Sequence, residues 1–513
     1  MSSEEPTTVV GARRPDDEDA GNRPSVPALT IIWHRDVRRI GDLGLLLHPE
    51  GSQISRKTPP FDAGADVVLS RAPFVSVLDR GGPVELRPIP SSVEIEVDGR
   101  PLENVRQLSE EQIRSGVILL LADELVVCLH RLMAPVQRGP SLGIVGGGDA
   151  IESVRRQIAR VADLDSSVLI RGETGTGKEL VALAIKDGST RAAGPFVTVS
   201  MADVPSQTAA AELFGYEKGA FTGASQSHPG YFAQAHGGTL FLDEIALAAP
   251  DVQKMLLRVL ETGEVRPLGS SRSRKVDVRL IVATDEKLEA AVREGRFSEP
   301  LLHRLSGYQI PLPPLRERRE DIGSLFLHFL RKELAAVGEL DRLATRDLAE
   351  RPWLEAVAVA RIAANPFAGN VRTLRNVARQ LVISNRGEKY AKIDAVIERI
   401  LATDQSLDDA PVTSPSPGRS TKVSDQEIQE ALQRRNYNFS AAAEALGIHR
   451  STLYDRVRAN PQGVRSASEI SDGEILESHD RHKGEIAAMA AELHVSPKPL
   501  KARLTDALAR RGG

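Results

Sequence analysis

One stretch of the chain brings together the groups that phosphate binding requires. It consists of Arg171-Gly172-Glu173-Thr174-Gly175-Thr176-Gly177-Lys178-Glu179. Glycines let backbone N–H groups curl around phosphate oxygens, a helix N-terminus adds its dipole, and Lys178 reaches the terminal phosphates. We therefore predict a nucleotide site at Gly172, Glu173, Thr174, Gly175, Thr176, Gly177, Lys178 and Glu179. Glu179 departs from the usual pattern, which has Ser or Thr in contact with Mg²⁺ at this position.

The residues on either side supply the setting that a phosphate loop needs. Residues 167–170 form a short apolar run that predicts a strand, and residues 180–185 predict a helix. A glycine-rich turn with a surface lysine is the alternative, because the bare motif occurs by chance. Strand, loop and helix together favour ATP binding.

A second apolar strand, residues 239–243, ends in two carboxylates, Asp243 and Glu244. Asp243 is placed to position Mg²⁺, and Glu244 to polarise the attacking water. A strand followed by an acidic helix start is the alternative. The pairing with the upstream phosphate loop favours catalysis.

Composition restricts the class of protein. A chain of 513 residues holds about three to four domains. Its net charge of −4 gives no global sign of nucleic-acid binding, so any basic surface must be local. The single cysteine, Cys128, excludes an intramolecular disulfide and a metal site built from cysteines. No run of ~20 apolar residues occurs, so we expect a cytoplasmic protein with no membrane segment.

Patterning predicts a multidomain chain: a β-sandwich, an α/β ATPase domain with a helical lid, and all-α helix-turn-helix units. The expected segments are a disordered acidic tail (1–28), the sandwich (29–134), a linker (135–141), the ATPase domain (142–403), a linker (404–422), a helix-turn-helix (423–460) and a second, degenerate one (461–513).

In the first of these units, Ser424 and Glu427 are predicted to form a capping box, and Gly447 to make the turn between a small-residue helix and a polar one. This pattern resembles a helix-turn-helix of the Fis type. The expected DNA contacts are Arg450, Ser451, Thr452, Tyr454, Arg456 and Arg458. A small helical bundle for assembly is the alternative.

The second unit repeats the first at an offset of 47 residues. Ser471-Asp472-Gly473-Glu474-Ile475 matches Ser424-Asp425-Gln426-Glu427-Ile428, and the hydrophobic positions that follow are preserved. This unit either binds DNA or stabilises a dimer of the first.

Gly219-Ala220-Phe221-Thr222-Gly223-Ala224 lies between the phosphate loop and the acidic strand, and would leave an aromatic residue at an exposed loop tip. This motif resembles the surface loop of sigma-54-dependent transcriptional activators, also called bacterial enhancer-binding proteins. Glu179, Asn370-Val371-Arg372 and Pro313-Pro314-Leu315-Arg316-Glu317-Arg318 agree with that resemblance, which covers about half of the chain.

The resemblance implies an AAA+ ATPase that assembles into a homo-oligomeric ring, a hexamer in expectation. It implies that Phe221 and Thr222 contact sigma-54 of RNA polymerase and are moved by ATP turnover. Arg304 then corresponds to an arginine finger that reaches the neighbouring subunit's ATP, and Arg372 to the sensor arginine of the lid.

Three residues depart from the family pattern. Ser298 replaces a second arginine, Ser200 replaces the Asn that holds the catalytic glutamate, and Asp285 replaces the sensor Asn. Arg296 is a candidate substitute for the missing arginine. A carboxylate at position 285 would repel the γ-phosphate unless it is protonated or paired with a metal. We therefore expect weak or tightly gated ATPase activity.

The front domain contains three short motifs in its expected loops: Ile54-Ser55-Arg56, Ser70-Arg71 and Val97-Asp98-Gly99. With these motifs it resembles a forkhead-associated (FHA) domain, a phosphothreonine-binding β-sandwich. The resemblance implies that Arg56, Ser70 and Arg71 bind phosphothreonine. A sandwich with solvated loop arginines is the alternative. A Ser/Thr kinase or a phosphothreonine protein is the expected partner.

Together these features predict an ATP-dependent activator that binds upstream DNA and remodels sigma-54 polymerase to the open complex. Two other functions are weighed against it: a ring ATPase for another task, and a DNA-binding repressor with a weak or lost ATPase.

Overall fold

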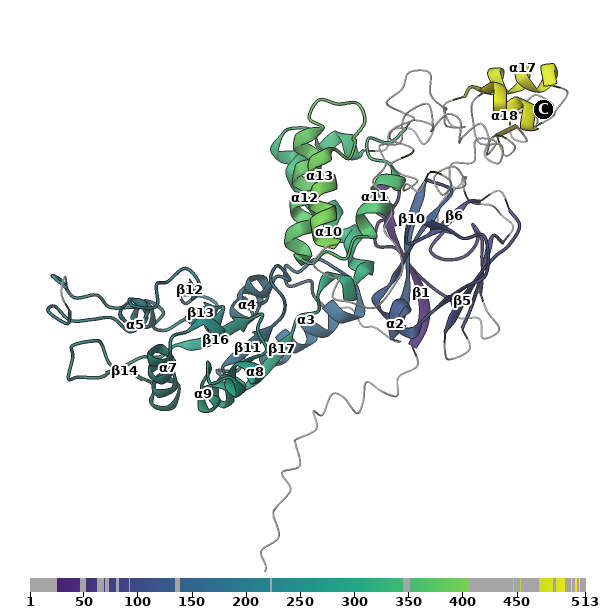
Figure 1. Ribbon diagram of the computed structural model, residues 1–513. Coiled ribbons are helices and arrows are strands. Elements are labelled where there is room, and N and C mark those ends of the chain that lie inside the picture. Colours follow the sequence, from purple (N-terminus) through teal and green to yellow (C-terminus); the bar gives the residue numbers. More distant parts are fainter. Residues whose placement is uncertain are drawn as a thin grey trace, which may run out of the picture.

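The computed structural model describes residues 25–46, 52–61, 69, 73–79, 83–91, 93–133, 139–221, 224–344, 351–405, 446, 453, 470–482, 486–493, 500, 503–504 and 507. They form a front domain of strands, an α/β domain, a helical lid and a small C-terminal helical unit (Figure 1). No helix in the described part of the chain is long and apolar enough to cross a membrane.

The front domain consists of two antiparallel sheets. The larger has the strand order β2-β1-β10-β9-β6-β7, and the smaller has the order β3-β4-β5-β8. Their bounds are β1 Ser25–Trp33, β2 Leu43–Leu45, β3 Ser52–Ile54, β4 Val75–Leu78, β5 Val84–Pro88, β6 Ile95–Val97, β7 Arg100–Pro101, β8 Arg106–Leu108, β9 Val117–Leu121 and β10 Leu125–Met133. Helix α2, Glu110–Ser115, precedes β9 and begins with a capping box formed by Ser109 and Gln112.

The central strands of the larger sheet are buried on both faces. Strand side chains alternate between the two faces of a sheet, so a continuous apolar run indicates cover on each side. In β9, Leu119 and Leu121 enter the core between the two sheets. Ile118 and Leu120 enter a second core shared with the lid helices. The front domain and the lid are therefore joined by packing as well as by the chain.

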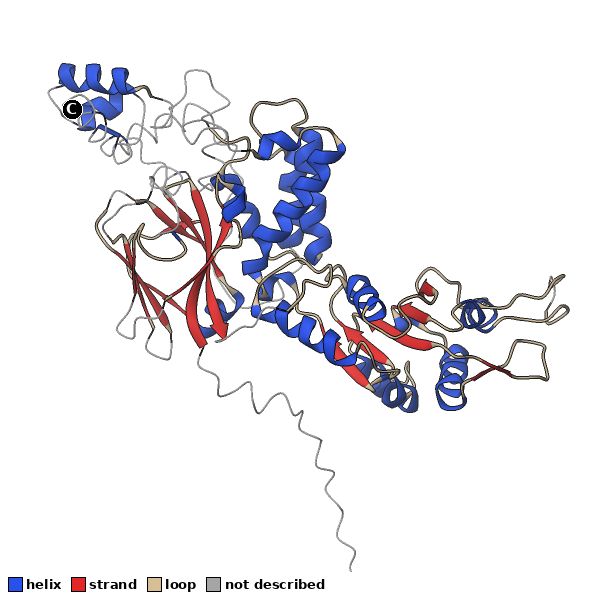
Figure 2. Ribbon diagram, turned by 180° about the vertical axis from the view of Figure 1, so that it is seen from behind, coloured by secondary structure: helices blue, strands red, loops and turns tan. Residues whose placement is uncertain are grey.

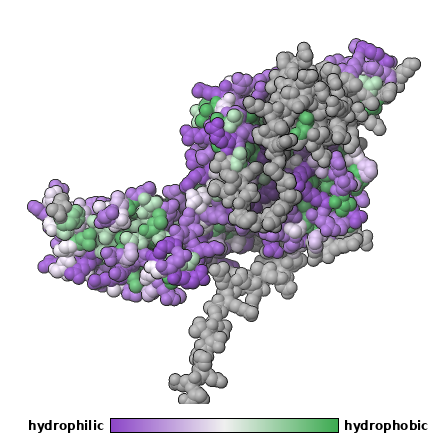
Figure 3. Space-filling view, viewed as in Figure 1, coloured by the Kyte–Doolittle hydropathy of each residue, from purple (hydrophilic) through white to green (hydrophobic). Residues whose placement is uncertain are grey.

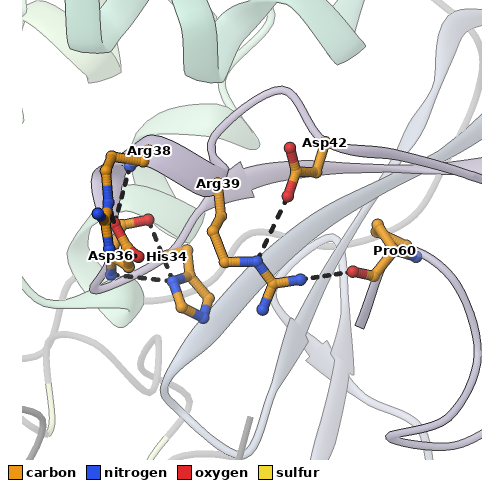
Figure 4. A network of polar contacts seen from close by, with 6 residues as sticks. All are labelled: His34, Asp36, Arg38, Arg39, Asp42 and Pro60. Atoms are coloured by element: carbon orange, nitrogen blue, oxygen red, sulfur yellow. Dashed lines mark hydrogen bonds and ion pairs between the residues drawn. The ribbon is translucent and has the colours of Figure 1, made fainter. Parts of the chain in front are cut away.

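A polar network closes the turn after β1 (Figure 4). The short 3₁₀ helix Val37–Arg39 is capped by Asp36, which accepts the N–H of Arg38. The Arg38 side chain also donates to Asp36 and lowers the pKa of that carboxyl to about 2. Arg39 donates to Asp42 and to the carbonyl of Pro60. The network thus ties this turn to the loop that follows β3.

The α/β domain contains a parallel sheet with the strand order β12-β13-β16-β11-β17. Its strands are β11 Val168–Arg171, β12 Phe196–Ser200, β13 Thr239–Asp243, β16 Arg279–Thr284 and β17 Tyr308–Pro311. Its helices are α3 Asp149–Val161, α4 Lys178–Asp187, α5 Ala209–Phe214, α6 Tyr231–Gln234, α7 Pro250–Thr262, α8 Leu288–Arg293 and α9 Glu299–Leu305. A small hairpin, β14 Glu264–Val265 with β15 Arg274–Lys275, stands outside the sheet.

The lid comprises α10 Ile322–Ala336, α11 Ala356–Ala363, α12 Asn370–Ser384 and α13 Ala395–Gln405. It stands between the front domain and the α/β domain (Figures 1 and 2). Both tryptophans of the chain, Trp33 of β1 and Trp353 of the lid, are buried in the shared core. Their fluorescence therefore reports on this contact.

Two boundaries differ from those expected from the sequence. Strand β1 begins at Ser25, inside the expected tail, because Ser25 to Leu29 pair with Met133 to Leu129 of β10. Helix α13 continues to Gln405, beyond the expected start of the linker at 404.

The C-terminal unit includes α17 Asp472–His482 and α18 Ile486–Leu493. Ser471 and Glu474 exchange hydrogen bonds as a capping box, as their spacing predicts. Ile475, Met489 and Leu500 share a small core. Arg503 donates to the carbonyl of Ile470, so this residue braces the unit.

Candidate functional site

The phosphate loop lies between β11 and α4, as the sequence predicts. Gly175 and Gly177 have φ of +81° and +104°, which favours glycine at both positions. A Cβ on Gly172 would lie 2.9 Å from the Cβ of Leu312, so the loop packs tightly on its sheet side. A Cβ on Gly177 would meet nothing closer than 3.9 Å. The space beside Gly177 is therefore open, whereas the start of α12 covers Gly175.

Lys178 is the first residue of α4 and is buried. Its Nζ donates to the carbonyls of Gly172, at 2.9 Å, and Glu173, at 3.4 Å. Thr176 donates its hydroxyl to the Glu173 carbonyl at 2.7 Å. These bonds hold the loop in a curl around the ammonium group. Glu179 is exposed in the first turn of the helix.

Asp243 and Glu244 lie at the carboxyl end of β13. Asp243 is paired in register with Ser200 of β12, and its Oδ1 accepts the N–H of Glu244 at 2.9 Å. Glu244 has φ of +54°, a sparsely populated conformation for a glutamate that is typical of functional sites. No group of three or more His, Cys, Asp or Glu residues in the described part of the chain could hold a metal alone. A Mg²⁺ ion here would thus need phosphate oxygens in addition to Asp243.

Asp285 follows β16, in the position where the family pattern has an asparagine. Its Oδ2 accepts a hydrogen bond of 2.7 Å from the Thr174 hydroxyl. The carboxylate is therefore held against the phosphate loop.

Two residues with no predicted role contact the phosphate loop: Arg316, which precedes the lid, and Asn370, the first residue of α12. Arg316 donates two hydrogen bonds, of 2.7 and 2.6 Å, to Glu173 and lowers the pKa of that carboxyl. Asn370 donates to Glu173 and to the carbonyl of Thr174, both at 3.1 Å, and accepts the N–H of Leu315 at 2.7 Å. Asn370 is fully buried with φ of +55°. The sequence feature that could have identified Asn370 is its position directly after Gly369, at the start of α12.

Arg372 lies in the first turn of α12, beside the phosphate loop. A Cβ on Gly175 would come within 3.1 Å of the Arg372 Cβ and 2.3 Å of the Gly369 carbonyl oxygen. The start of α12 is therefore in close contact with the loop, with the Arg372 side chain exposed.

Arg304 lies at the end of α9 and is exposed. It donates to the carbonyl of Leu260 at 2.9 Å. Ser298 precedes α9, and its N–H donates to Gln253. Arg296 forms ion pairs with Glu286, at 3.0 Å, and Glu294, at 2.8 Å. Both partners would have to be released before Arg296 could substitute for an arginine at position 298.

The loop between α5 and α6, which carries Phe221, projects from the outer end of the α/β domain beside the β14–β15 hairpin (Figure 1). The Phe221 side chain is 46% exposed and contacts the ring of Tyr216 at a centroid distance of 5.0 Å. Tyr216 also stacks on His228, and Ala220 packs against Gly269 of the hairpin. Hydrophobic residues gather at the surface toward this end of the domain (Figure 3). Thr222 lies outside the described residues.

Some predicted site residues lie outside the described part of the chain. These are Ser70 and Arg71 of the front domain and Arg450, Ser451, Thr452, Tyr454, Arg456 and Arg458 of the first helix-turn-helix. Arg56 is described and lies half-buried in the turn after β3. Ser55, next to it, accepts the N–H of Lys57.

The sheet order, with the phosphate-loop strand β11 between β16 and β17, and the helical lid define a P-loop protein of the AAA+ class. Three family models match the chain and agree with this class. They are the sigma-54 interaction domain at residues 144–311, the AAA+ ATPase lid domain at 316–411, and the bacterial regulatory protein, Fis family, at 421–459.

Relatives along most of the chain extend these matches. The C4-dicarboxylate transport transcriptional regulatory protein DctD of Pseudomonas aeruginosa is 35% identical over 83% of this chain and 86% of that protein. The DNA-binding transcriptional regulator NtrC of Escherichia coli K12 is 44% identical over 52% of this chain. The chain thus belongs to the family of sigma-54-dependent transcriptional activators.

The match to Escherichia coli NtrC spans 57% of that relative's length. Among solved structures, NtrX from Brucella abortus in complex with ATP is 33% identical, with 62% of this chain and 69% of that chain covered and a TM-score of 0.44.

Proposed function

We propose that this chain is an ATP-driven activator that opens promoters for sigma-54 RNA polymerase. The observation that carries the proposal is the phosphate loop between β11 and α4, in which the buried Lys178 donates to two loop carbonyls and the space beside Gly177 is open. ATP, when bound, supplies the phosphoanhydride bond, and Mg²⁺ neutralises its phosphate charge.

Each catalytic residue takes a role that its position supports. Gly172 to Gly177 present backbone N–H groups, Lys178 binds the terminal phosphates, and Glu179 lies at the edge of the site. Asp243 would hold Mg²⁺ together with the phosphates. Glu244 accepts a proton from the attacking water.

Two arginines serve the phosphates from other elements. Arg304 is exposed, which suits a finger that enters a neighbouring subunit's site in a hexameric ring. Arg372 lies against the phosphate loop in its own subunit, where it could sense the γ-phosphate. An arginine finger contributes about 10³–10⁵ in rate.

In this proposal, ATP turnover moves the loop that bears Phe221 and Thr222. An aromatic side chain that is 46% exposed on a projecting loop suits contact with another protein, and sigma-54 is that partner in this proposal. The loop packs on the β14–β15 hairpin through Ala220 and Gly269, so the two would move together.

DNA binding is assigned to the Fis-type region. Arg450, Ser451, Thr452, Tyr454, Arg456 and Arg458 would contact an upstream site. Paired half-sites about one helical turn apart are expected for a dimer of such units. The unit at 461–513 would bind DNA or support that dimer.

The front domain would regulate the cytoplasmic activator as a forkhead-associated module. Two packed sheets and an arginine in the turn after β3 support this role. Arg56, Ser70 and Arg71 would bind a phosphothreonine produced by a Ser/Thr kinase.

A DNA-binding regulator with a weak or lost ATPase is the second candidate. The carboxylate of Asp285 held against the phosphate loop favours it, because like charge opposes the γ-phosphate.

The two candidates are separated by ATP binding and steady-state hydrolysis in the full chain. Under the first, the parent hydrolyses ATP, Lys178→Ala loses binding, and Glu244→Gln binds ATP but loses about 10²–10⁴ in turnover. A parent that binds ATP without any turnover, indistinguishable from Glu244→Gln, would contradict it.

A further inference from the structure

Residues 312–321 connect the last strand of the α/β sheet to the first lid helix, and we call the last seven of them, Leu315 to Asp321, the junction segment. They form two short 3₁₀ helices, Leu315–Glu317 and Arg319–Asp321. Arg316 is paired with Glu173 of the phosphate loop at 2.6 Å. Arg318 is almost fully buried and donates to the Thr176 carbonyl at 3.3 Å. Two of its arginines therefore hold the phosphate loop.

The next arginine reaches the front domain and the lid. Arg319 donates to the carbonyl of Gly116 at 2.9 Å and forms an ion pair with Asp98 at 3.1 Å, both in the front domain. It also donates to the carbonyl of Ala363 at the end of α11, at 3.2 Å. The side chains of Arg319 and Asp98 are 15% and 27% exposed, so this pair is only partly accessible to water. Asp98 also accepts the N–H of Ile118, which fixes its carboxylate on the sheet.

The contact between the front domain and the junction segment has little free space. A Cβ on Gly116 would lie 2.7 Å from Cys128 Sγ and 3.2 Å from the Arg319 Cβ. Just beyond the segment, a Cβ on Gly323 would lie 2.2 Å from the Ile32 carbonyl oxygen. A close-packed contact transmits displacement, because side chains cannot absorb it in voids.

The remaining end of the segment is anchored as well. Asp321 accepts the N–H groups of Gly147 and Gly148 at 2.7 and 2.9 Å. Leu315 is held by Asn370 at one end of the segment, and Asp321 is held at the other. We therefore expect a displacement of Arg319 to move Arg316 and Arg318.

We propose that Arg319 is a positioning residue through which the front domain sets the geometry of the phosphate loop. Asp98 and Gly116 hold Arg319, and the short segment then places Arg316 on Glu173 and Arg318 on Thr176. In this arrangement the front domain supports nucleotide binding. The inference rests on the proposed ATP site, and by linkage ATP must in turn affect the front domain.

The test compares ATP affinity in full-length variants by calorimetric titration with Mg²⁺–ATP in the Glu244→Gln background. Asp98→Asn removes the charge and keeps the size and the acceptor for Ile118. Arg319→Gln removes the other partner. We expect each to raise the Kd for ATP about fivefold. The double variant should lose little more than either single variant, because the pair acts as a unit.

Glu85→Gln is the matched control. It breaks an ion pair with Arg87 in the smaller sheet of the same domain, away from the junction. Its Kd for ATP should equal that of the background chain. Tryptophan emission verifies that the shared core around Trp33 and Trp353 is intact in each variant.

Hydrogen exchange of the Glu244→Gln chain, with both coupling residues intact, supplies a second readout. ATP should slow exchange at the amides of residues 98–121 as well as at the phosphate loop. A folded Asp98→Asn chain with a Kd within about twofold of its background would overturn the coupling, as would ATP protection confined to the phosphate loop. No ATP binding by a chain with both coupling residues intact would overturn the proposed function itself, and the coupling with it.

Discussion

Thr174 and Asp285 are joined by a hydrogen bond of 2.7 Å between the phosphate loop and the end of β16. The bond holds a carboxylate in the position where the family pattern has a neutral amide. The carboxylate of Asp285 therefore lies next to the phosphate loop, where its charge can act on a bound phosphate.

Asp285→Asn should accelerate ATP hydrolysis. An asparagine still accepts the Thr174 hydroxyl and removes a charge that opposes the γ-phosphate. At an effective dielectric constant of about 20, two unit charges roughly 10 Å apart repel by roughly 1–2 kcal/mol, so kcat/KM for ATP should rise up to about tenfold. Steady-state ATPase assays over a range of ATP concentrations would measure it. Glu286→Gln, which removes a neighbouring charge paired with Arg296, is the control, and an equal kcat/KM of Asp285→Asn and parent would refute the repulsion.

Ser298→Arg should also raise turnover of the assembled ring. Arg296 is held by ion pairs with Glu286 and Glu294. It therefore does not supply the guanidinium group that the family pattern has at position 298. A restored arginine should add about tenfold or more in kcat. Arg296→Gln in the parent should leave kcat near its original value. A large loss in that control would show that Arg296 already serves as the substitute.

The sequence predicted the elements that carry the chemistry better than the contacts between domains. The phosphate loop and the acidic strand are local patterns, so strand, turn and helix signals sufficed, whereas the loop of Phe221 was assigned from a family resemblance. The continuous apolar runs of β9 and β10 indicate that both faces of these strands are buried. They do not show which part of the protein covers each face. Arg316, Arg319 and Asn370 act through neighbours distant in sequence, such as Glu173 and Asp98, and no spacing rule identifies such pairs.

Acid should destabilise the front domain through His130. Burial lowers the pKa of His130 to about 4, and its Nε2 is hydrogen-bonded to Thr30 Oγ1 at 2.8 Å. The unfolded chain takes up this proton near pH 6.5 and the folded chain does not. Stability from the neutral ring is therefore complete above pH 6.5 and is lost as the pH falls to 4, by about 3 kcal/mol at most.

Urea unfolding followed by tryptophan fluorescence at pH 7, 5.5 and 4.5 would test this. His130→Gln should show a flatter dependence on pH over the same range, whatever its absolute stability. Parallel curves for parent and variant would exclude His130 as the source.

Gly323→Ala should loosen the contact between the lid and the front domain. Its Cβ would lie 2.2 Å from the Ile32 carbonyl oxygen, and overpacking of this kind costs about 1–3 kcal/mol. Urea unfolding with tryptophan emission would detect both the lower stability and the exposure of Trp33. Gly139→Ala meets nothing within 4 Å and should be close to neutral. Equal stability of the two variants would contradict the tight contact.

The account depends most directly on Phe221, and open-complex formation by sigma-54 polymerase on a promoter with an upstream site is the measurement that tests it. Phe221→Ala should keep ATPase activity within about twofold of the parent and lose open-complex formation, whereas Leu247→Ala, another exposed apolar residue of the same domain, should keep both. If Phe221→Ala opens the promoter as well as the parent does, the loop is not the output of ATP turnover and the proposed mechanism is wrong.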